Sequence, residues 1–319
     1  MDLVAGRGDT AVMQNWHDRI ELIRMRSHRA GTPAFRAELA RGRFTLLCPE
    51  IAVPTQEYAA LRVWERQELR AFGVGLGTRK AVVVGKSAAR LHGIPVLGWN
   101  EPVTLSLPGL SRPPRGQWPQ GVEYRKAALF PEHVTEHHGV RVTRIIRTAV
   151  DLSRHHGVID GIVAFDHILA MPGMTRARAE ETIDQLGRMR GLQAARRALE
   201  LADPRAESPI ESWARAQILT AELPEVTSVE LQVSVLDGRY RVDILVNGFQ
   251  VVETDGDLKY DGVSTGIAPE EQMRRDRERD RALTNAGIPR LHVTHADLAE
   301  DRFLGMLRDA LRAYATKAA

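Results

Sequence analysis

The spacing of hydrophobic positions predicts mainly helices in the first eighty residues of the chain. Apolar side chains recur at helical intervals through residues 12–29, which therefore predict an amphipathic helix with a basic face. Residues 32–54 predict a short helix, a turn at Gly42 and two strands that form a wing-like hairpin. Residues 57–72 return to helical spacing. We therefore expect a helical region that contains one small hairpin.

The pattern then changes from helices to strands and back. Residues 81–98 predict a strand or turn followed by a short helix, and three strand-like segments lie between residues 101 and 150. A loop rich in proline and glycine separates the first two of these segments. Residues 146–201 are helical again, and "LADPRAESP" at residues 201–209 has the composition of a linker.

The last third of the chain alternates helices and strands. The expected elements are a helix, a strand, a two-strand hairpin, a charged helix, a strand and a final helix, over residues 209–222, 229–236, 239–246 with 250–255, 268–286, 288–294 and 301–316. A chain of 319 residues is long enough for two or three domains. We predict an α+β protein divided into residues 1–80, 81–203 and 204–319.

The hairpin near residue 248 carries three acidic residues whose arrangement depends on its register. A two-residue Asn-Gly turn would pair position 243 with 252 and direct Glu253 to the opposite face. A three-residue loop centred on Gly248 pairs position 243 with 253, which places Asp243, Glu253 and Asp255 on one face. The second register leaves an apolar face that can be buried, and we therefore prefer it. The residues of that face are Val242, Ile244, Val246 and Val252.

Clustered carboxylates repel one another unless a cation or a proton intervenes. Ligands that are all oxygen select hard ions such as Mg²⁺ or Mn²⁺, which polarise phosphoryl oxygens and activate water. The alternative is a solvated end of a hairpin whose acidic residues serve solubility, since acidic turns are common. The hairpin alone leaves both interpretations open.

Composition excludes several classes of protein. The single cysteine, Cys48, rules out a disulfide framework and a cysteine-based zinc site. Aromatic residues make up 5%, which argues against a single-strand binder built on stacked aromatic side chains. The start of the chain lacks the pattern of a signal peptide, and no segment approaches a membrane span, so we expect a cytoplasmic protein with no membrane partner.

Charge is distributed unevenly along the chain. Residues 1–200 contain 29 Lys and Arg against 20 Asp and Glu, a net charge of +9, whereas residues 201–319 contain 15 against 21, a net charge of −6. A basic front suits a polyanionic partner, and an acidic back suits the recruitment of cations. Plain solubility would also account for such charges.

Residues 205–300 contain five short motifs in a fixed order. They are "SPIESWAR", "LQVSV", "RVDILV", "VVETDGDLKY" and "DRERDRALTNAGIPRL". Each motif alone is weak, and the ordered set is more specific. This order resembles the core of the PD-(D/E)XK nuclease superfamily, and more closely the branch related to very-short-patch-repair endonucleases.

The resemblance implies a restriction-endonuclease-like α/β domain with a central mixed sheet that hydrolyses DNA phosphodiesters with Mg²⁺ or Mn²⁺. Asp243 and Glu253 would ligate the metal, and Glu211 would assist from the first helix. The superfamily places lysine two residues after the glutamate, where this chain has Asp255; Lys259 is the nearest replacement. The same likeness points to DNA-facing roles for two further residues, Gln232 and Arg279, the latter as a phosphate contact or as a salt bridge that orients the site.

The front of the chain contains four further segments of note, "ELARGRFTLLCPEIAVP", "GKSAARLHGIP", "GVRVTRIIRTAVDLSR" and "ESPIES". Through them it resembles actinobacterial proteins in which a winged-helix domain of the abortive-infection antitoxin type precedes such a nuclease-like domain. This resemblance implies phosphate contacts from Arg36, Arg41 and Arg43 at the wing. This chain departs from those proteins in the length of its first part. Only about 33 residues precede "TPAFRAEL", so the usual set of helices is abbreviated.

The function expected from these features is metal-dependent cutting of double- or single-stranded DNA. A homodimer is one expectation, because duplex cleavage by one site per chain favours a dimer or sequential nicking. One alternative is a DNA-binding repressor or antitoxin-like regulator with a degenerate, inactive nuclease fold. The other is a protein-interaction component of phage defence, with a partner protein in a toxin–antitoxin or defence system.

Overall fold

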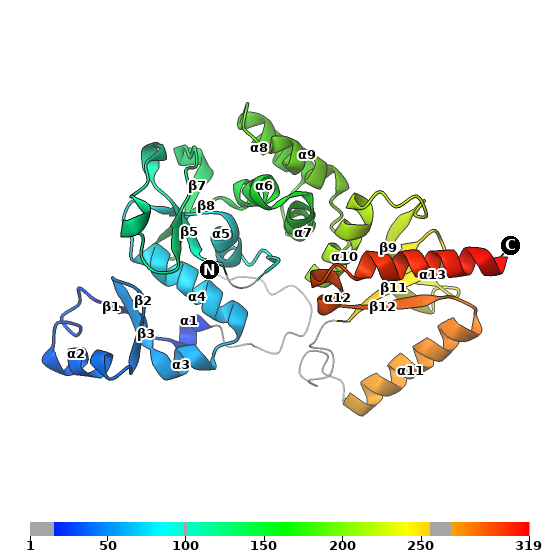
Figure 1. Cartoon of the computed structure of the whole chain (residues 1–319), viewed down its shortest axis with the longest axis horizontal. Helices are drawn as coiled ribbons and strands as arrows, with labels where there is room; N and C mark the ends of the chain where they lie inside the picture. Colours follow the sequence, from blue (N-terminus) through cyan, green and yellow to red (C-terminus); the bar gives the residue numbers. More distant parts are fainter. Residues whose placement is uncertain (1–15, 99–100, 256–268, 319) are drawn as a thin grey trace. The chain divides into compact units, whose positions relative to one another are not determined.

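The computed structural model describes residues 16–98, 101–255 and 269–318, and its fold is α+β (Figure 1). The chain divides between Glu200 and Leu201 into two compact units, here called the N-terminal and the C-terminal unit. The sequence places the corresponding boundary between residues 203 and 204. The core of the N-terminal unit contains residues from Trp16 to Val142, on both sides of the boundary expected at residue 80.

The N-terminal unit begins with a small antiparallel sheet in the order β1-β3-β2, next to helix α2 (Pro33–Ala40). The strands are β1 (Ile23–Arg24), β2 (Phe44–Cys48) and β3 (Ile51–Pro54). The helix expected over residues 12–29 is wrong within the described residues. Only α1 (Trp16–Arg19) is helical there, because Ile23 pairs with Ala52 and is buried as part of the sheet.

A second sheet of five strands follows in the order β6-β5-β4-β8-β7. The expected helix over residues 57–72 is two helices, α3 (Thr55–Ala60) and α4 (Val63–Leu76), separated at Leu61. The strands are β4 (Val82–Val83), β5 (Val103–Ser106), β6 (Val122–Tyr124), β7 (Val134–His137) and β8 (Val140–Thr143). β7 has no counterpart among the expected strands, because three of its four residues are polar.

Helices complete the N-terminal unit, as the pattern of residues 146–201 predicts. α5 and α6 pack together, and so do α6 and α7. Short 3-10 turns occupy part of the proline-rich loop. The helices are α5 (Gly85–Leu91), α6 (Ile145–His156), α7 (Val158–Leu169), α8 (Arg176–Gln185) and α9 (Leu192–Leu201).

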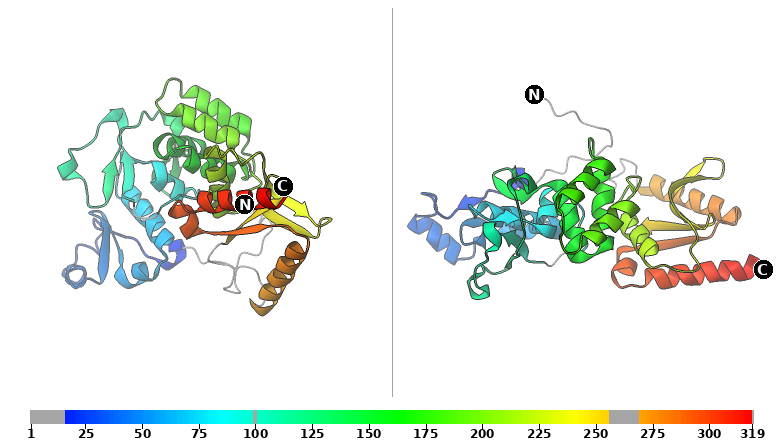
Figure 2. Two further views of the ribbon diagram at one scale, coloured as in Figure 1. Left: turned by 45° about the vertical axis from the view of Figure 1, so that its right-hand side comes forward. Right: turned by 90° about the horizontal axis from the view of Figure 1, so that it is seen from above.

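The C-terminal unit is a four-stranded mixed sheet, in the order β12-β11-β10-β9, with helices on both faces (Figures 1 and 2). β11 runs parallel to β12, and the other neighbouring strands are antiparallel. The strands are β9 (Val229–Val235), β10 (Tyr240–Val246), β11 (Gln250–Asp255) and β12 (Arg290–Thr294). The helices are α10 (Pro209–Thr220), α11 (Pro269–Asn285), α12 (His295–Ala299) and α13 (Phe303–Ala318).

Two hydrophobic clusters hold this unit together, one on each face of the sheet. α10, α12 and α13 cover one face, where Ile218, Ile244 and Phe303 are fully buried. α11 lies on the other face and is followed by Ile288, which packs against Val251. Among the described residues, no helix combines the length and the apolar character needed to cross a membrane.

Candidate functional site

The hairpin between β10 and β11 has the register with the three-residue loop. Ile244 pairs with Val252 and Val246 with Gln250, so three residues form the loop and positions 243 and 253 stand opposite each other. The loop residues Asn247 and Gly248 have φ values of 55° and 72°, in the left-handed region that Asn and Gly tolerate best. The three-residue loop is confirmed.

The apolar face that motivated this register is not one continuous surface. Ile244, Val246 and Val252 lie in the cluster under α10 and α13, but Val242 packs in the cluster on the other face. The side-chain alternation is therefore interrupted at Asp243. The cause lies in β9, where Gln232, opposite Asp243, has a φ of 55° and breaks the regular pairing of the two strands.

Glu211 is held at the start of α10 by local hydrogen bonds. Ser208 caps the helix, and its hydroxyl accepts from the Glu211 backbone N–H at 3.2 Å. The Glu211 carboxylate accepts from the Gln232 side-chain amide at 2.8 Å and from the Glu207 backbone N–H at 3.0 Å. Glu211 is 2% exposed. Both of its oxygens therefore have donors. One of these donors is the side chain of Gln232, the residue whose backbone is left-handed.

Asp243 bridges the two strands of the hairpin through its side chain. Its Oδ2 accepts from the backbone N–H of Thr254 at 3.1 Å. The regular pairing of β10 with β11 ends at Ile244 and Val252. The Asp243 carboxylate therefore binds a backbone N–H that lies just beyond the paired residues. This contact fixes the carboxylate beside Glu253, the residue that precedes Thr254.

Glu253 is paired with a cation from α11. Its Oε1 lies 2.7 Å from Arg279 Nη2, and the same Nη2 donates to the Arg241 carbonyl at 2.9 Å. Glu253 is 6% exposed, and its Oε1 has no aligned hydrogen bond among the described residues, so the pair is held by charge. Of the two roles expected for Arg279, the structure places it in the salt bridge.

The three carboxylates influence one another electrostatically. Burial raises the pKa of Glu211 to about 7, and the neighbouring Asp243 contributes in the same direction. Burial also raises the pKa of Glu253, again with a contribution from Asp243, while Arg279 and His292 oppose the rise. A proton or a cation would therefore be bound favourably among these side chains.

The protonation of Glu211 predicts a pH-dependent stability. Its folded pKa lies above its ordinary value of 4.5, so its contribution is complete below pH 4.5 and is lost as pH rises through about 7. We expect the free energy of unfolding to fall by about 3 kcal/mol from this group over that interval. Urea unfolding at pH 5 and pH 7.5 should show a smaller fall for Glu211→Gln than for wild type. Equal falls would contradict the assignment.

Two of the predicted residues are ligands of the kind that a hard divalent ion prefers. Asp243 and Glu253 provide carboxylate oxygens, and Glu253 Oε1 already has Arg279 as its cation. Within the described ranges, no three His, Cys, Asp or Glu side chains are spaced as ligands of one metal. An ion held by these two carboxylates would therefore need water or substrate oxygens as its other ligands. Asp255 ends β11, but its side chain and Lys259 lie outside the described residues.

The predicted arginines of the N-terminal unit lie on and after α2. Arg41 and Arg43 both contact the Glu38 carboxylate, at 3.2 and 3.0 Å, and both side chains remain mostly exposed. Arg36 is exposed on α2. Arg41 and Arg43 therefore lie together at Glu38, and Arg36 lies two residues before Glu38 on the same helix.

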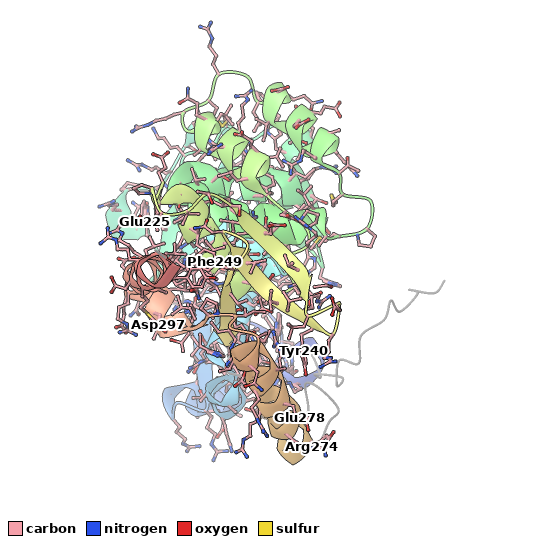
Figure 3. The ribbon with its side chains drawn as sticks, turned by 90° about the vertical axis from the view of Figure 1, so that its right-hand side faces the viewer. Glu225, Tyr240, Phe249, Arg274, Glu278 and Asp297 are labelled. Atoms are coloured by element: carbon pink, nitrogen blue, oxygen red, sulfur yellow. The ribbon has the colours of Figure 1, made fainter. Side chains whose placement is uncertain are left out.

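Sequence reasoning missed several residues that shape the site. Thr254 supplies the donor to Asp243, and Arg241 pairs with Glu207 at 2.6 Å beside the start of α10. Neither contact has a sequence signal, because both depend on the register of the hairpin. The charged residues of α11 behave as expected of a solvated helix, since Arg274 and Glu278 are exposed and Arg274 pairs with Glu271 (Figure 3).

Comparison of the chain with models of protein families, with curated proteins and with solved structures found no match in any of the three.

Proposed function

We propose that the chain is a metal-dependent DNA endonuclease whose site lies between α10, β10 and β11. The observation that carries the proposal is the juxtaposition of Asp243 and Glu253 at the distorted end of a hairpin, with Glu211 electrostatically coupled to Asp243. The order of elements supports it as well, because a helix with Glu211 precedes the strands with the two other acids in a mixed sheet.

The side chains have distinct roles in this proposal. Asp243 and Glu253 would hold Mg²⁺ or Mn²⁺, which when bound neutralises phosphate charge and makes water more acidic. Glu211 positions Gln232 and adds negative potential that favours a cation. Arg279 orients Glu253 and stands close enough to share its charge with a phosphate. Asp255 replaces the lysine that orients water in the superfamily, which predicts slow cutting.

The N-terminal unit supports DNA as the substrate. α2 precedes the β2–β3 hairpin, and β1 adds to that hairpin beside β3, an arrangement compatible with a winged helix. Arg36, Arg41 and Arg43 would contact the phosphate backbone and supply affinity without sequence preference. Glu38 would be displaced from Arg41 and Arg43 when phosphates bind.

The test of this proposal is cleavage of supercoiled plasmid and of labelled single-stranded DNA by the full chain. We expect conversion to nicked or linear plasmid in Mg²⁺ or Mn²⁺ and no conversion in excess EDTA. Structured RNA of similar length is the comparison substrate. An absence of cutting by folded protein on every substrate and with both ions would contradict the nuclease proposal.

A DNA-binding regulator that does not cut is the second candidate. Two observations favour it: Arg279 already neutralises Glu253, and the position of the expected lysine is Asp255. Such a protein would bind DNA with an affinity that falls steeply with salt, and would leave plasmid intact in both metals. Binding with this salt dependence and without cleavage would replace the nuclease proposal with this one.

A further inference from the structure

A cavity of about 390 Å³ lies in the N-terminal unit, whereas the acidic cluster described above belongs to the C-terminal unit. Its walls come from the start of α6, from the 3-10 turn before β7 and β7 itself, and from α8. The size lies within the range of cavities that take small organic ligands. Most of the charged groups that line it are cationic, and Glu132 is the one acidic side chain among the described lining residues.

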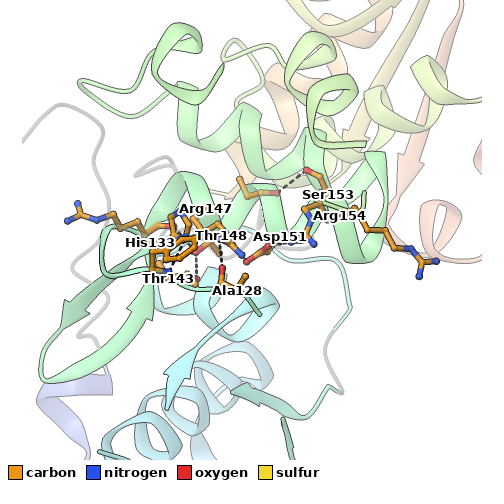
Figure 4. A network of polar contacts seen from close by, with 12 residues as sticks. Ala128, His133, Thr143, Arg147, Thr148, Asp151, Ser153 and Arg154 are labelled. Carbon is orange, nitrogen blue, oxygen red and sulfur yellow. Dashed lines mark hydrogen bonds and ion pairs between the residues drawn. The ribbon is translucent and has the colours of Figure 1, made fainter. Parts of the chain in front are cut away.

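Arg147 forms the buried part of the cavity wall and is 1% exposed. Its Nε donates to Asp151 at 3.0 Å, and its Nη1 donates to the Ala128 carbonyl at 3.2 Å (Figure 4). Its Nη2 has no hydrogen-bond acceptor among the described residues. A buried guanidinium nitrogen without an acceptor is costly, and this cost is removed when an anion binds beside it.

His133 lines the same cavity with a fixed tautomer. Its Nδ1 lies 3.0 Å from Arg147 Nη1 and 3.2 Å from the Phe130 backbone nitrogen, and both partners can only donate. Nδ1 is therefore the acceptor, and the ring hydrogen is on Nε2. Burial and the nearby Arg147 lower the pKa of His133, in agreement with a neutral ring. The His133 side chain also has a hydrogen bond to the backbone of Ala128.

Two more arginines line the cavity from its exposed side. Arg144 precedes α6 and gives the helix no side-chain cap, and Arg178 lies on the exposed surface of α8. Within the described parts of the chain, neither guanidinium forms an ion pair. The 12-residue helix α6 also directs its positive end here. Ile146 and Met174 also line the cavity and are apolar.

We propose that this cavity binds the phosphate group of a small phosphate monoester, between the start of α6 and α8. The phosphate would accept from Arg147 Nη2 and from the two exposed arginines, Arg144 and Arg178. The apolar wall would contact the organic part, for which the cavity leaves room. A phosphate fits better than a carboxylate, because its three terminal oxygens match donors that arrive from several directions.

The test is calorimetric titration of the full chain with phenyl phosphate, inorganic phosphate and benzoate at low salt. We expect phenyl phosphate to bind more tightly than inorganic phosphate, and benzoate to bind more weakly than phenyl phosphate. Arg178→Gln and Arg144→Gln should each lower the affinity for phenyl phosphate by about 10-fold, which is the scale of one charge-assisted hydrogen bond. Both residues are exposed, so the variants should fold normally.

Arg197→Gln is the matched control, because Arg197 is an exposed arginine on α9 that pairs with Glu200 outside the cavity. It should leave the affinity unchanged. No detectable binding of phenyl phosphate would overturn the proposal, and so would equal weakening by the control variant. If Arg178→Gln weakens binding of duplex DNA and not of phenyl phosphate, this surface is a nucleic-acid contact and the small-ligand site is wrong.

Discussion

Replacing Asp243 with asparagine is expected to lower the rate of DNA cleavage by about 10²–10³-fold, the scale on which removal of one group that stabilises developing charge acts. Asparagine keeps the size of the side chain, and its amide oxygen can still accept from the Thr254 N–H. The hairpin should therefore keep its register while the site loses one of its negative charges. Plasmid nicking in Mn²⁺, followed over time, measures the change.

Asp237→Asn provides the control for this experiment. Asp237 is an exposed acidic residue in the turn before β10, with a φ of 57° that asparagine accommodates well. The substitution removes the same charge from the same unit without touching the carboxylate cluster. Equal cleavage rates for wild type and Asp243→Asn would place the chemistry elsewhere, and equal loss in both variants would make it an effect of net charge.

The register of the acidic hairpin was predictable because burial decides it. A one-residue shift of β11 would have moved Val252 away from the cluster that contains Ile244 and Val246, and hydrophobic burial is a large enough term to select one pairing. The elements of the C-terminal unit were predictable for the same reason, since their periodicity reflects which face is covered. The α+β class follows from the same pattern.

The contacts within the site could not be predicted in this way. The family resemblance singled out Arg279, but its pairing with Glu253 has no signal in the hydrophobic pattern, because the helix is densely charged and carries several other arginines. The left-handed conformation of Gln232 has no local signal, because glutamine rarely adopts it. The helix expected over residues 12–29 failed for a related reason: long-range pairing of Ile23 with Ala52 overrides local periodicity.

Arg147→Met is expected to lower the free energy of unfolding of the N-terminal unit by about 3 kcal/mol, at the lower end of the range for breaking a buried ion pair. The substitution removes the partner of Asp151, which is 3% exposed, and the donor to the Ala128 carbonyl. The loss is limited because Arg154 still donates to Asp151 at 2.6 Å. Urea unfolding followed by tryptophan fluorescence reports mainly on this unit, which contains four of the five tryptophans.

A double-mutant cycle separates the ion pair from simple loss of packing. If the carboxylate left behind causes the instability, adding Asp151→Asn to Arg147→Met should cost less than the sum of the two single changes, by about 0.5–3 kcal/mol. Additive effects would mean that the two charges are not coupled, and would contradict the assignment. Arg197→Met, at an exposed position, should change stability by no more than about 0.5 kcal/mol. Nε and Nη1 of Arg147 make these stabilising contacts, whereas Nη2 has no acceptor among the described residues.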